Sequence, residues 1–133
     1  MGCARKVKQI VVITPNKVGM LAEISSIIAV NGINIIALCA YGLIDKANFM
    51  IITEDNQRAI AALKAKNYEV VKEEDVGVLS IPNKPGETKR IAEKLATSNI
   101  NLEYCYNTTG DSKDSLFVFA TNHLDMALEI LNK

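Results

Sequence analysis

The chain has 133 residues, of which 49% are hydrophobic, and its 15 basic and 15 acidic residues leave a formal net charge of zero. This composition argues against a disordered chain, and it gives no electrostatic reason to expect nucleic acid or an anionic membrane as a partner. No stretch approaches the roughly 20 apolar residues of a membrane span. The three cysteines form no CxxC pair and fit reduced thiols, so we expect a cytoplasmic protein.

The predicted elements follow one order twice along the chain. β-Branched residues indicate a strand at 8–14, and apolar residues at helical spacing indicate a helix at 19–30 that ends at Asn31-Gly32. The next elements are a strand at 33–41, a turn at 42–46, a strand at 47–53, a helix at 56–66 and a short strand at 68–72. The second series runs 76–81, 86–98, 100–108, 115–121 and 122–131, with a hairpin turn at Gly110-Asp111-Ser112.

This order predicts an α+β protein with two βαββαβ modules and antiparallel sheets, at 5–72 and 73–133. The acids Glu73-Glu74-Asp75 are expected in the turn between them. The second module has no obvious fourth strand, so its sheet has three strands or something else fills that edge. The strands at 33–41, 49–52 and 116–120 are apolar on both faces. We therefore expect a second sheet, within the chain or across a homodimer, to cover the face without helices.

The two series have similar sequences where a strand passes into a helix. Thr14-Pro15-Asn16-Lys17-Val18-Gly19-Met20 returns as Ile81-Pro82-Asn83-Lys84-Pro85-Gly86-Glu87. The same spacing pairs Ile33-Asn34-Ile35 with Ile100-Asn101-Leu102, and Lys46 with Lys113. Asparagine or proline beside glycine suits a tight turn between strand and helix. The sequence therefore indicates an internal duplication.

Sequence signs of an enzyme are missing. There is no phosphate-binding glycine motif, and the single histidine, His123, excludes a histidine-rich metal site. The acid pair Glu54-Asp55 is interpreted as solvated or helix-capping. We expect no catalytic residue, no metal and no cofactor. RNA-binding modules share the βαββαβ order, but they need aromatic residues on the central strands and a basic surface. The central strands here carry mostly Ile, Val and Ala and the net charge is zero, so the sequence gives little support to RNA binding.

The duplicated loop suggests a binding site. Backbone N–H groups at a helix N-terminus suit a carboxylate, and Asn16 and Asn83 add an amide that donates and accepts. Asn34 and Asn101 stand among apolar residues, where a buried amide costs free energy unless it is paired. A ligand with an ammonium and a carboxylate group could satisfy them. Alternatively, Asn16 and Asn83 cap their helices, and Asn34 and Asn101 bond at a strand edge or helix end.

The chain resembles a tandem pair of ACT domains, which are small regulatory modules that sense amino acids in metabolic enzymes. The residues that carry the resemblance are Asn16-Lys17-Val18-Gly19-Met20-Leu21 with Asn31-Gly32-Ile33-Asn34-Ile35, and Asn83-Lys84-Pro85-Gly86 with Ile100-Asn101-Leu102. The likeness extends from about residue 8 to residue 131. It implies two ferredoxin-like modules and an amino-acid effector between them.

When the family's ligand-binding positions are transferred to this sequence, the resemblance implies two ligand sites. The first would combine Asn16, Gly19, Met20 and Leu21 with Asn101, Leu102 and Glu103. The second would combine Asn83, Gly86 and Glu87 with Asn34, Ile35 and Ile36. Val18 replaces the usual proline and Thr88 the usual aliphatic residue. Glu103 aligns with Ile36 in the repeat, so we expect the two sites to differ. We favour the first, because Met20 and Leu21 keep the usual apolar wall. The expected function is non-catalytic regulation by an amino acid, with a homodimer and a metabolic enzyme as partners. The alternative is a protein-interaction module without a ligand.

Overall fold

A computed structural model of the chain describes residues 3–108 and 113–133; the predicted turn at Gly110-Asp111-Ser112 lies outside the described residues. The chain forms two compact units, each of which is described by itself. The first unit is Lys8–Glu74. The second unit contains Asp75–Lys133 and also the N-terminal residues as far as Val7.

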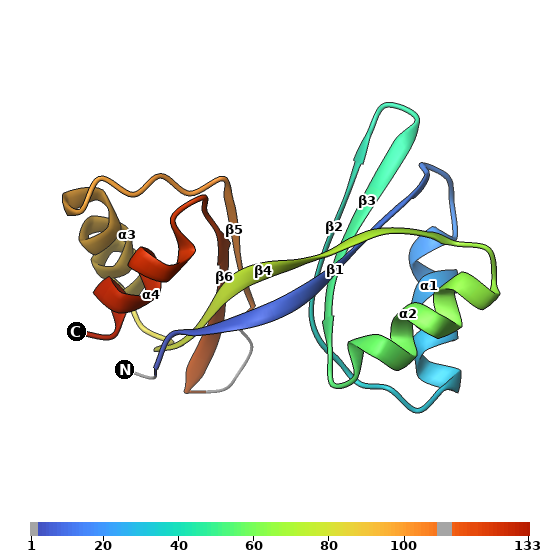
Figure 1. Ribbon diagram of the computed structural model, residues 1–133, viewed down its shortest axis with the longest axis horizontal. Helices are drawn as coiled ribbons and strands as arrows, with labels where there is room; N and C mark the ends of the chain where they lie inside the picture. Colours follow the sequence, from blue (N-terminus) through green and yellow to red (C-terminus); the bar gives the residue numbers. More distant parts are fainter. Residues whose placement is uncertain (1–2, 109–112) are drawn as a thin grey trace. The chain divides into compact units, whose positions relative to one another are not determined.

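The first unit is an antiparallel sheet with two helices on one face (Figure 1). Its strands stand in the order β2-β3-β1-β4. Their bounds are β1 Arg5–Pro15, β2 Ile35–Leu43, β3 Lys46–Thr53 and β4 Glu69–Pro82. The helices are α1 (Met20–Val30) and α2 (Asn56–Ala65). β1 and β4 each continue from one unit into the other, so only part of each belongs to this sheet.

The second unit repeats the arrangement with the strand order β1-β4-β6-β5. Its own elements are α3 (Glu87–Thr97), β5 (Tyr104–Thr108), β6 (Asp114–Ala120) and α4 (Leu124–Leu131). The mixed α+β class and the antiparallel sheets that the sequence predicts are thereby confirmed.

Each unit has a core between its helices and its sheet, built from equivalent residues. Ile24 in α1 and Ile91 in α3 are both fully buried, as are Leu63 in α2 and Leu131 in α4. Helical spacing places these apolar side chains on one stripe of each helix, which packs on the sheet and leaves the polar face in water. The duplication seen in the sequence is therefore a duplication of the core as well.

The sheet face without helices is also apolar and buried. In β1 and β3, the side chains of Val11, Met50 and Ile52 alternate with those of the helix-facing core and are each at least nine-tenths buried. In the second unit Val78 and Val118 occupy this face and are equally buried. The expectation that the strands at 49–52 and 116–120 are apolar on both faces is confirmed, whereas most residues of β2 are half-buried or exposed. The expected homodimer stays a prediction.

Two predicted boundaries are wrong. The strands expected at 68–72 and 76–81 are one strand, β4, so Glu73, Glu74 and Asp75 lie within a strand and not in a turn. The polar run does not break the strand because Gln9 donates to Glu74, and Asn56 and Gln57 donate to Glu73. The strand expected at 100–108 begins only at Tyr104. The limits 5–72 and 73–133 for the two domains stay predictions.

The predicted pairing of Lys46 with Lys113 is wrong by one residue. The N–H of Asn16 donates to the carbonyl oxygen of Asp45 at 2.9 Å, and the N–H of Asn83 donates to that of Lys113 at 2.7 Å. Asp45 is therefore the structural counterpart of Lys113. The segment from Asn83 to Lys113 is one residue longer than the segment from Asn16 to Asp45, and the elements after it are shifted accordingly.

The N-terminal segment of the chain occupies the fourth-strand edge of the second unit. Arg5, the first residue of β1, belongs with Val7 to this unit, and β1 is the neighbour of β4 in the sheet. Ala4 is buried in the core of the unit, and Lys6 forms an ion pair with Asp125 of α4 at 2.8 Å. The sequence left two alternatives open for this edge, a three-stranded sheet or an edge filled by something else. The second is correct, because β1 fills the edge.

None of the helices in the described part of the chain is long and apolar enough to cross a membrane. A grouping of three or more His, Cys, Asp or Glu residues that could hold a metal ion is also missing from the described residues. The cytoplasmic location stays a prediction.

Candidate functional site

The strand-to-helix loop has the same backbone geometry in both units. Gly19 stands immediately before α1 with φ 93° and ψ −4°, and Gly86 stands before α3 with φ 89° and ψ −7°. Residues with a Cβ rarely adopt this left-handed conformation, so glycine fits both positions. The turn brings the chain from the end of a strand into the first helical turn. The first N–H groups of such a helix have no partner within the helix.

Asn16 does not cap α1, and this interpretation of the sequence is wrong. Gly19 is the residue before the helix, and no side chain caps it. The Nδ2 atom of Asn16 instead donates to the carbonyl oxygen of Ile44 at 3.1 Å, in the turn between β2 and β3. Asn16 therefore fastens the loop to the β2–β3 hairpin.

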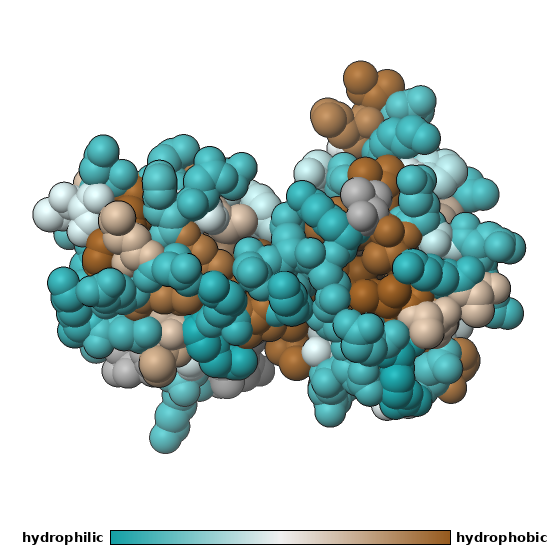
Figure 2. Space-filling model, viewed as in Figure 1, coloured by the Kyte–Doolittle hydropathy of each residue, from teal (hydrophilic) through white to brown (hydrophobic). Residues whose placement is uncertain are grey.

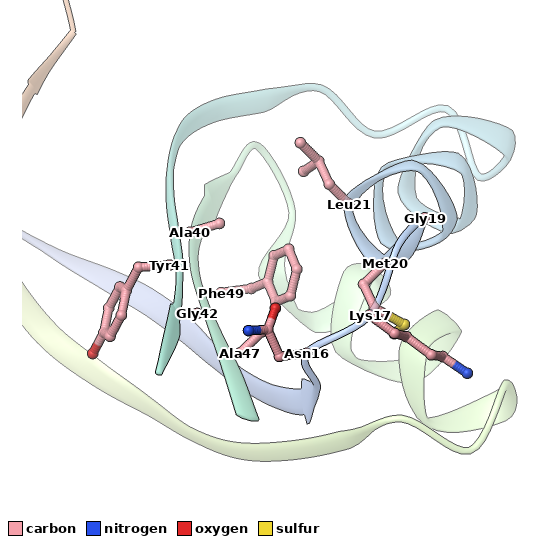
Figure 3. A pocket seen from close by; sticks show the side chains of 10 residues that line it. All are labelled: Asn16, Lys17, Gly19, Met20, Leu21, Ala40, Tyr41, Gly42, Ala47 and Phe49. Atoms are coloured by element: carbon pink, nitrogen blue, oxygen red, sulfur yellow. The ribbon is translucent and has the colours of Figure 1, made fainter. Parts of the chain in front are cut away.

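The first unit has a cavity of about 250 Å³ between this loop and the hairpin (Figure 3). All four predicted residues of the first loop line it, namely Asn16, Gly19, Met20 and Leu21. The other lining residues are Lys17 from the loop and Ala40, Tyr41, Gly42, Ala47 and Phe49 from the hairpin.

The cavity offers polar groups beside an apolar wall. The amide of Asn16 and the ring of Phe49 both line it, together with Leu21 and Ala40 (Figure 3). Lys17 and Tyr41 extend away from it. The N-terminus of α1, at Met20, adds a partial positive charge. A small molecule with a carboxylate and an apolar part matches these groups, which are few and convergent as in ordinary ligand sites.

The sequence did not reveal the hairpin side of the cavity. Gly42 could have been found, because glycine within a strand pattern often marks a close approach of another group. A Cβ added at Gly42 would lie 2.5 Å from Nδ2 of Asn16, so the amide occupies the space that a side chain would need. Ala47 and Phe49 carry no such signal, since they read as ordinary core residues of β3.

The predicted second-strand asparagines are exposed, so the argument that burial forces them to find a partner is wrong. Asn34 precedes β2, and its carbonyl oxygen accepts from the N–H of Glu54 at 3.1 Å. Asn101 precedes β5, and its carbonyl oxygen accepts from Thr121 at 2.8 Å. Neither amide is desolvated, because both residues lie in connections before their strands begin. Ile35, the first residue of β2, is half-buried.

The remaining predicted residues lie in the second unit. Asn83 is exposed, Gly86 begins the turn into α3, and Leu102 packs against the core. Glu87 pairs with Arg90 at 2.7 Å, and this guanidinium holds the pKa of the Glu87 carboxyl below its usual range. Glu103 is exposed, and its N–H donates to the carbonyl oxygen of Ala120. The predicted pairing of residues from the two modules in one site stays a prediction.

A second cavity, of about 410 Å³, lies in the second unit. Its lining includes none of the predicted residues and comes from α3 and the C-terminal end of the chain: Arg90, Glu93, Lys94, Thr97, Ser98, Ile130 and Lys133. Arg90 and Glu93 are already paired, with Glu87 and Lys89 respectively. We therefore take the cavity of the first unit as the candidate site.

Solved structures with the same fold span nearly the whole chain. A protein from Bacteroides thetaiotaomicron is 29% identical, with a TM-score of 0.88, over 96% of this chain and 88% of that one. The regulatory subunit of aspartate kinase from Thermus thermophilus is 16% identical, with a TM-score of 0.67, over 93% and 89%. That from Thermus flavus is 18% identical, with a TM-score of 0.63, over 98% and 95%.

A comparison with curated proteins gave no match. The model of one sequence family, described as an ACT domain pair, matches residues 5–133. This match includes both repeats of the strand-to-helix loop and both helix pairs. The chain belongs to the family of ACT domain pairs.

Proposed function

We propose that the chain is a non-catalytic regulatory protein that binds an amino acid in the cavity of its first unit. The observation that carries the proposal is the convergence of the duplicated loop and the β2–β3 hairpin on one space, with an amide, a helix N-terminus and an apolar wall. The N-terminus of α1 suits the carboxylate, the Asn16 amide suits the ammonium or carboxylate, and Phe49 suits an apolar side chain. Membership in a regulatory family supports this assignment.

A thermal-shift screen against each standard amino acid tests the proposal. A ligand at about a hundred times its dissociation constant should add roughly 2.7 kcal/mol to the free energy of unfolding. Asn16→Ala should keep the fold, because Asn16 is exposed, and should remove the stabilisation by the ligand. Asn107→Ala is the matched control, since Asn107 is an exposed asparagine on β5 that does not line the cavity. A shift retained in Asn16→Ala would refute this site.

A protein-interaction module is the second candidate function. Its support is a group of exposed apolar side chains around the cavity and the hairpin: Val18, Leu21, Tyr41, Leu43 and Ile44. Figure 2 shows hydrophobic residues at the projecting tip of the β2–β3 hairpin. Exposed apolar groups of this kind mark contact surfaces. The Thermus proteins of the same fold are regulatory subunits of aspartate kinase, so a metabolic enzyme is the partner we propose, by analogy of fold.

We also propose a homodimer in which β2 of one copy pairs with β2 of the other. β2 lies at the edge of its sheet, and its sequence IIALCAYGL contains no charge and no proline. Edge strands without such residues readily pair with another strand. An antiparallel pair centred on the middle of β2 would place the two Cys39 residues opposite each other, within the range of a disulfide.

Oxidation of a variant that keeps only Cys39, with Cys3→Ser and Cys105→Ser, should give a covalent dimer. Burial raises the pKa of the Cys39 thiol, so the reaction needs alkaline pH to supply the thiolate. The matched variant keeps only Cys3, which is exposed and lies outside the strands, and should stay monomeric under the same conditions. Equal cross-linking of the two variants would contradict pairing through β2.

A further inference from the structure

One side chain belongs both to the cavity and to the tip of the β2–β3 hairpin. Asn16 lines the cavity, and its Nδ2 atom donates to the carbonyl oxygen of Ile44 at 3.1 Å. Its backbone N–H donates to the carbonyl oxygen of Asp45 at 2.9 Å. The last pair of the hairpin is Leu43 with Lys46, so the turn consists of Ile44 and Asp45. The two bonds from Asn16 therefore hold both residues of the turn.

The tip has a backbone conformation that its side chain disfavours. Ile44 has φ 59°, in the left-handed region, which β-branched residues rarely adopt. Its side chain is 90% exposed, so packing does not compensate for the strain. A strained residue keeps such a conformation only where its surroundings impose it. Here the hairpin register and the two bonds from Asn16 are the restraints.

The Asn16 amide lies in a space that is open because residue 42 is glycine. The amide occupies the space of the missing side chain, and a Cβ there would lie within 2.9 Å of the Cγ, Nδ2 and Oδ1 atoms of Asn16. The amide therefore lies between the cavity and the turn. An amide nitrogen carries two hydrogens, so Asn16 can donate to Ile44 and to a ligand at once.

We propose that Asn16 is a latch through which a ligand in the cavity fixes the hairpin tip. This inference rests on the proposed function, because it assumes that an amino acid occupies the cavity. In the free protein the bond from Asn16 to Ile44 is exposed to water. A ligand that bonds to the amide and covers it holds the amide in place and so strengthens the bond. Because coupling is reciprocal, restraint of the tip increases the affinity for the ligand.

The consequence is a surface that changes with the ligand. Leu43 and Ile44 are 65% and 90% exposed and form the apolar end of the hairpin. Without ligand the strained turn opens more often. With ligand, the two side chains are presented in one arrangement, which lowers the entropy cost of binding at this surface.

Hydrogen–deuterium exchange of the full chain tests the latch, with the amides of residues 43–46 as the readout. The probe is the amino acid that gives the largest shift in the thermal screen, at a saturating concentration. We expect it to slow exchange at the tip about fivefold, the factor of one ordinary hydrogen bond. Asn16→Asp, which keeps the size of the side chain and loses its donor, should speed exchange by a similar factor without ligand. Asn107→Asp is the control for the added charge and should leave the tip unchanged.

A double-mutant cycle of Asn16 and Ile44 distinguishes the loss of the hydrogen bond between these two residues from a general loosening of the loop. Glycine adopts positive φ without strain, so in an Ile44→Gly background the turn needs the latch less, and Asn16→Asp should have a smaller effect there. An equal effect in both backgrounds, or unchanged tip exchange with a bound amino acid, overturns the latch and leaves the proposed function standing. A thermal screen without any hit overturns the proposed function, and the coupling with it.

Discussion

Replacing Gly77 with isoleucine should lower the free energy of unfolding by about 3 kcal/mol or more, the upper range for overpacking a core. Gly77 lies in β4 opposite Phe119 of β6 and is buried. Even a single Cβ at Gly77 would collide with the Phe119 ring, which fills the space over the glycine. Urea unfolding followed by circular dichroism measures the loss.

The first unit fills the position equivalent to the pair of Gly77 and Phe119 in a different way. There the equivalent cross-strand pair is Ile10 with Ile51, and both side chains are fully buried. The duplicated sheets therefore fill the same place in two ways, with two medium side chains or with one large side chain over a glycine. The residues of each pair depend on each other, so a change at one member alone leaves the core overfilled or underfilled.

The double variant Gly77→Ile/Phe119→Ile transfers the pair of the first unit into the second. It should be more stable than Gly77→Ile alone, because removal of the ring gives the new side chain room. Ser80→Ala is the control on the same strand, and it should change stability by no more than about 0.5 kcal/mol since Ser80 is exposed. Equal stability of the double variant and the Gly77→Ile variant would contradict the account of this pair.

The order of elements could be predicted because local signals agree with the fold. Helical spacing placed Ile24 and Ile91 in the cores, and the repeated loop with Gly19 and Gly86 was recognised by its composition. What the sequence could not show depends on contacts between distant residues. The polar run at Glu73 and Glu74 reads as a turn, yet side chains of α2 and β1 bond to it and allow one strand to continue.

The candidate site was predictable only on the side of the loop. A glycine and an asparagine before a helix give a local signal, whereas Ala47 and Phe49 line the cavity because of the register of β3. The asparagines before β2 and β5 misled the sequence interpretation, because apolar neighbours suggest burial. The strands begin later than the apolar pattern does, and both Asn34 and Asn101 are exposed.

Replacing Ala4 with aspartate should lower the free energy of unfolding by about 3 kcal/mol or more, because it places an unpaired carboxylate in a core. Ala4 is 4% exposed and packs in the core of the second unit. Its N–H donates to Oδ1 of Asn132 at 2.7 Å, and its carbonyl oxygen accepts from Nδ2 of the same side chain at 2.9 Å. This pair of bonds fastens the start of the described chain to the end of α4, beside the edge that β1 occupies.

Cys3→Asp is the matched control for Ala4→Asp, since Cys3 is exposed one residue earlier and receives the same charge. It should change stability by no more than about 0.5 kcal/mol. Asn132→Ala removes both bonds to Ala4 without adding charge, and at about 1 kcal/mol for each bond it should cost about 2 kcal/mol. If the Ala4→Asp variant were as stable as Cys3→Asp, the N-terminal residues would not complete the second unit. A loss in both Ala4→Asp and Asn132→Ala would mean that the second module depends on a strand from the far end of the chain.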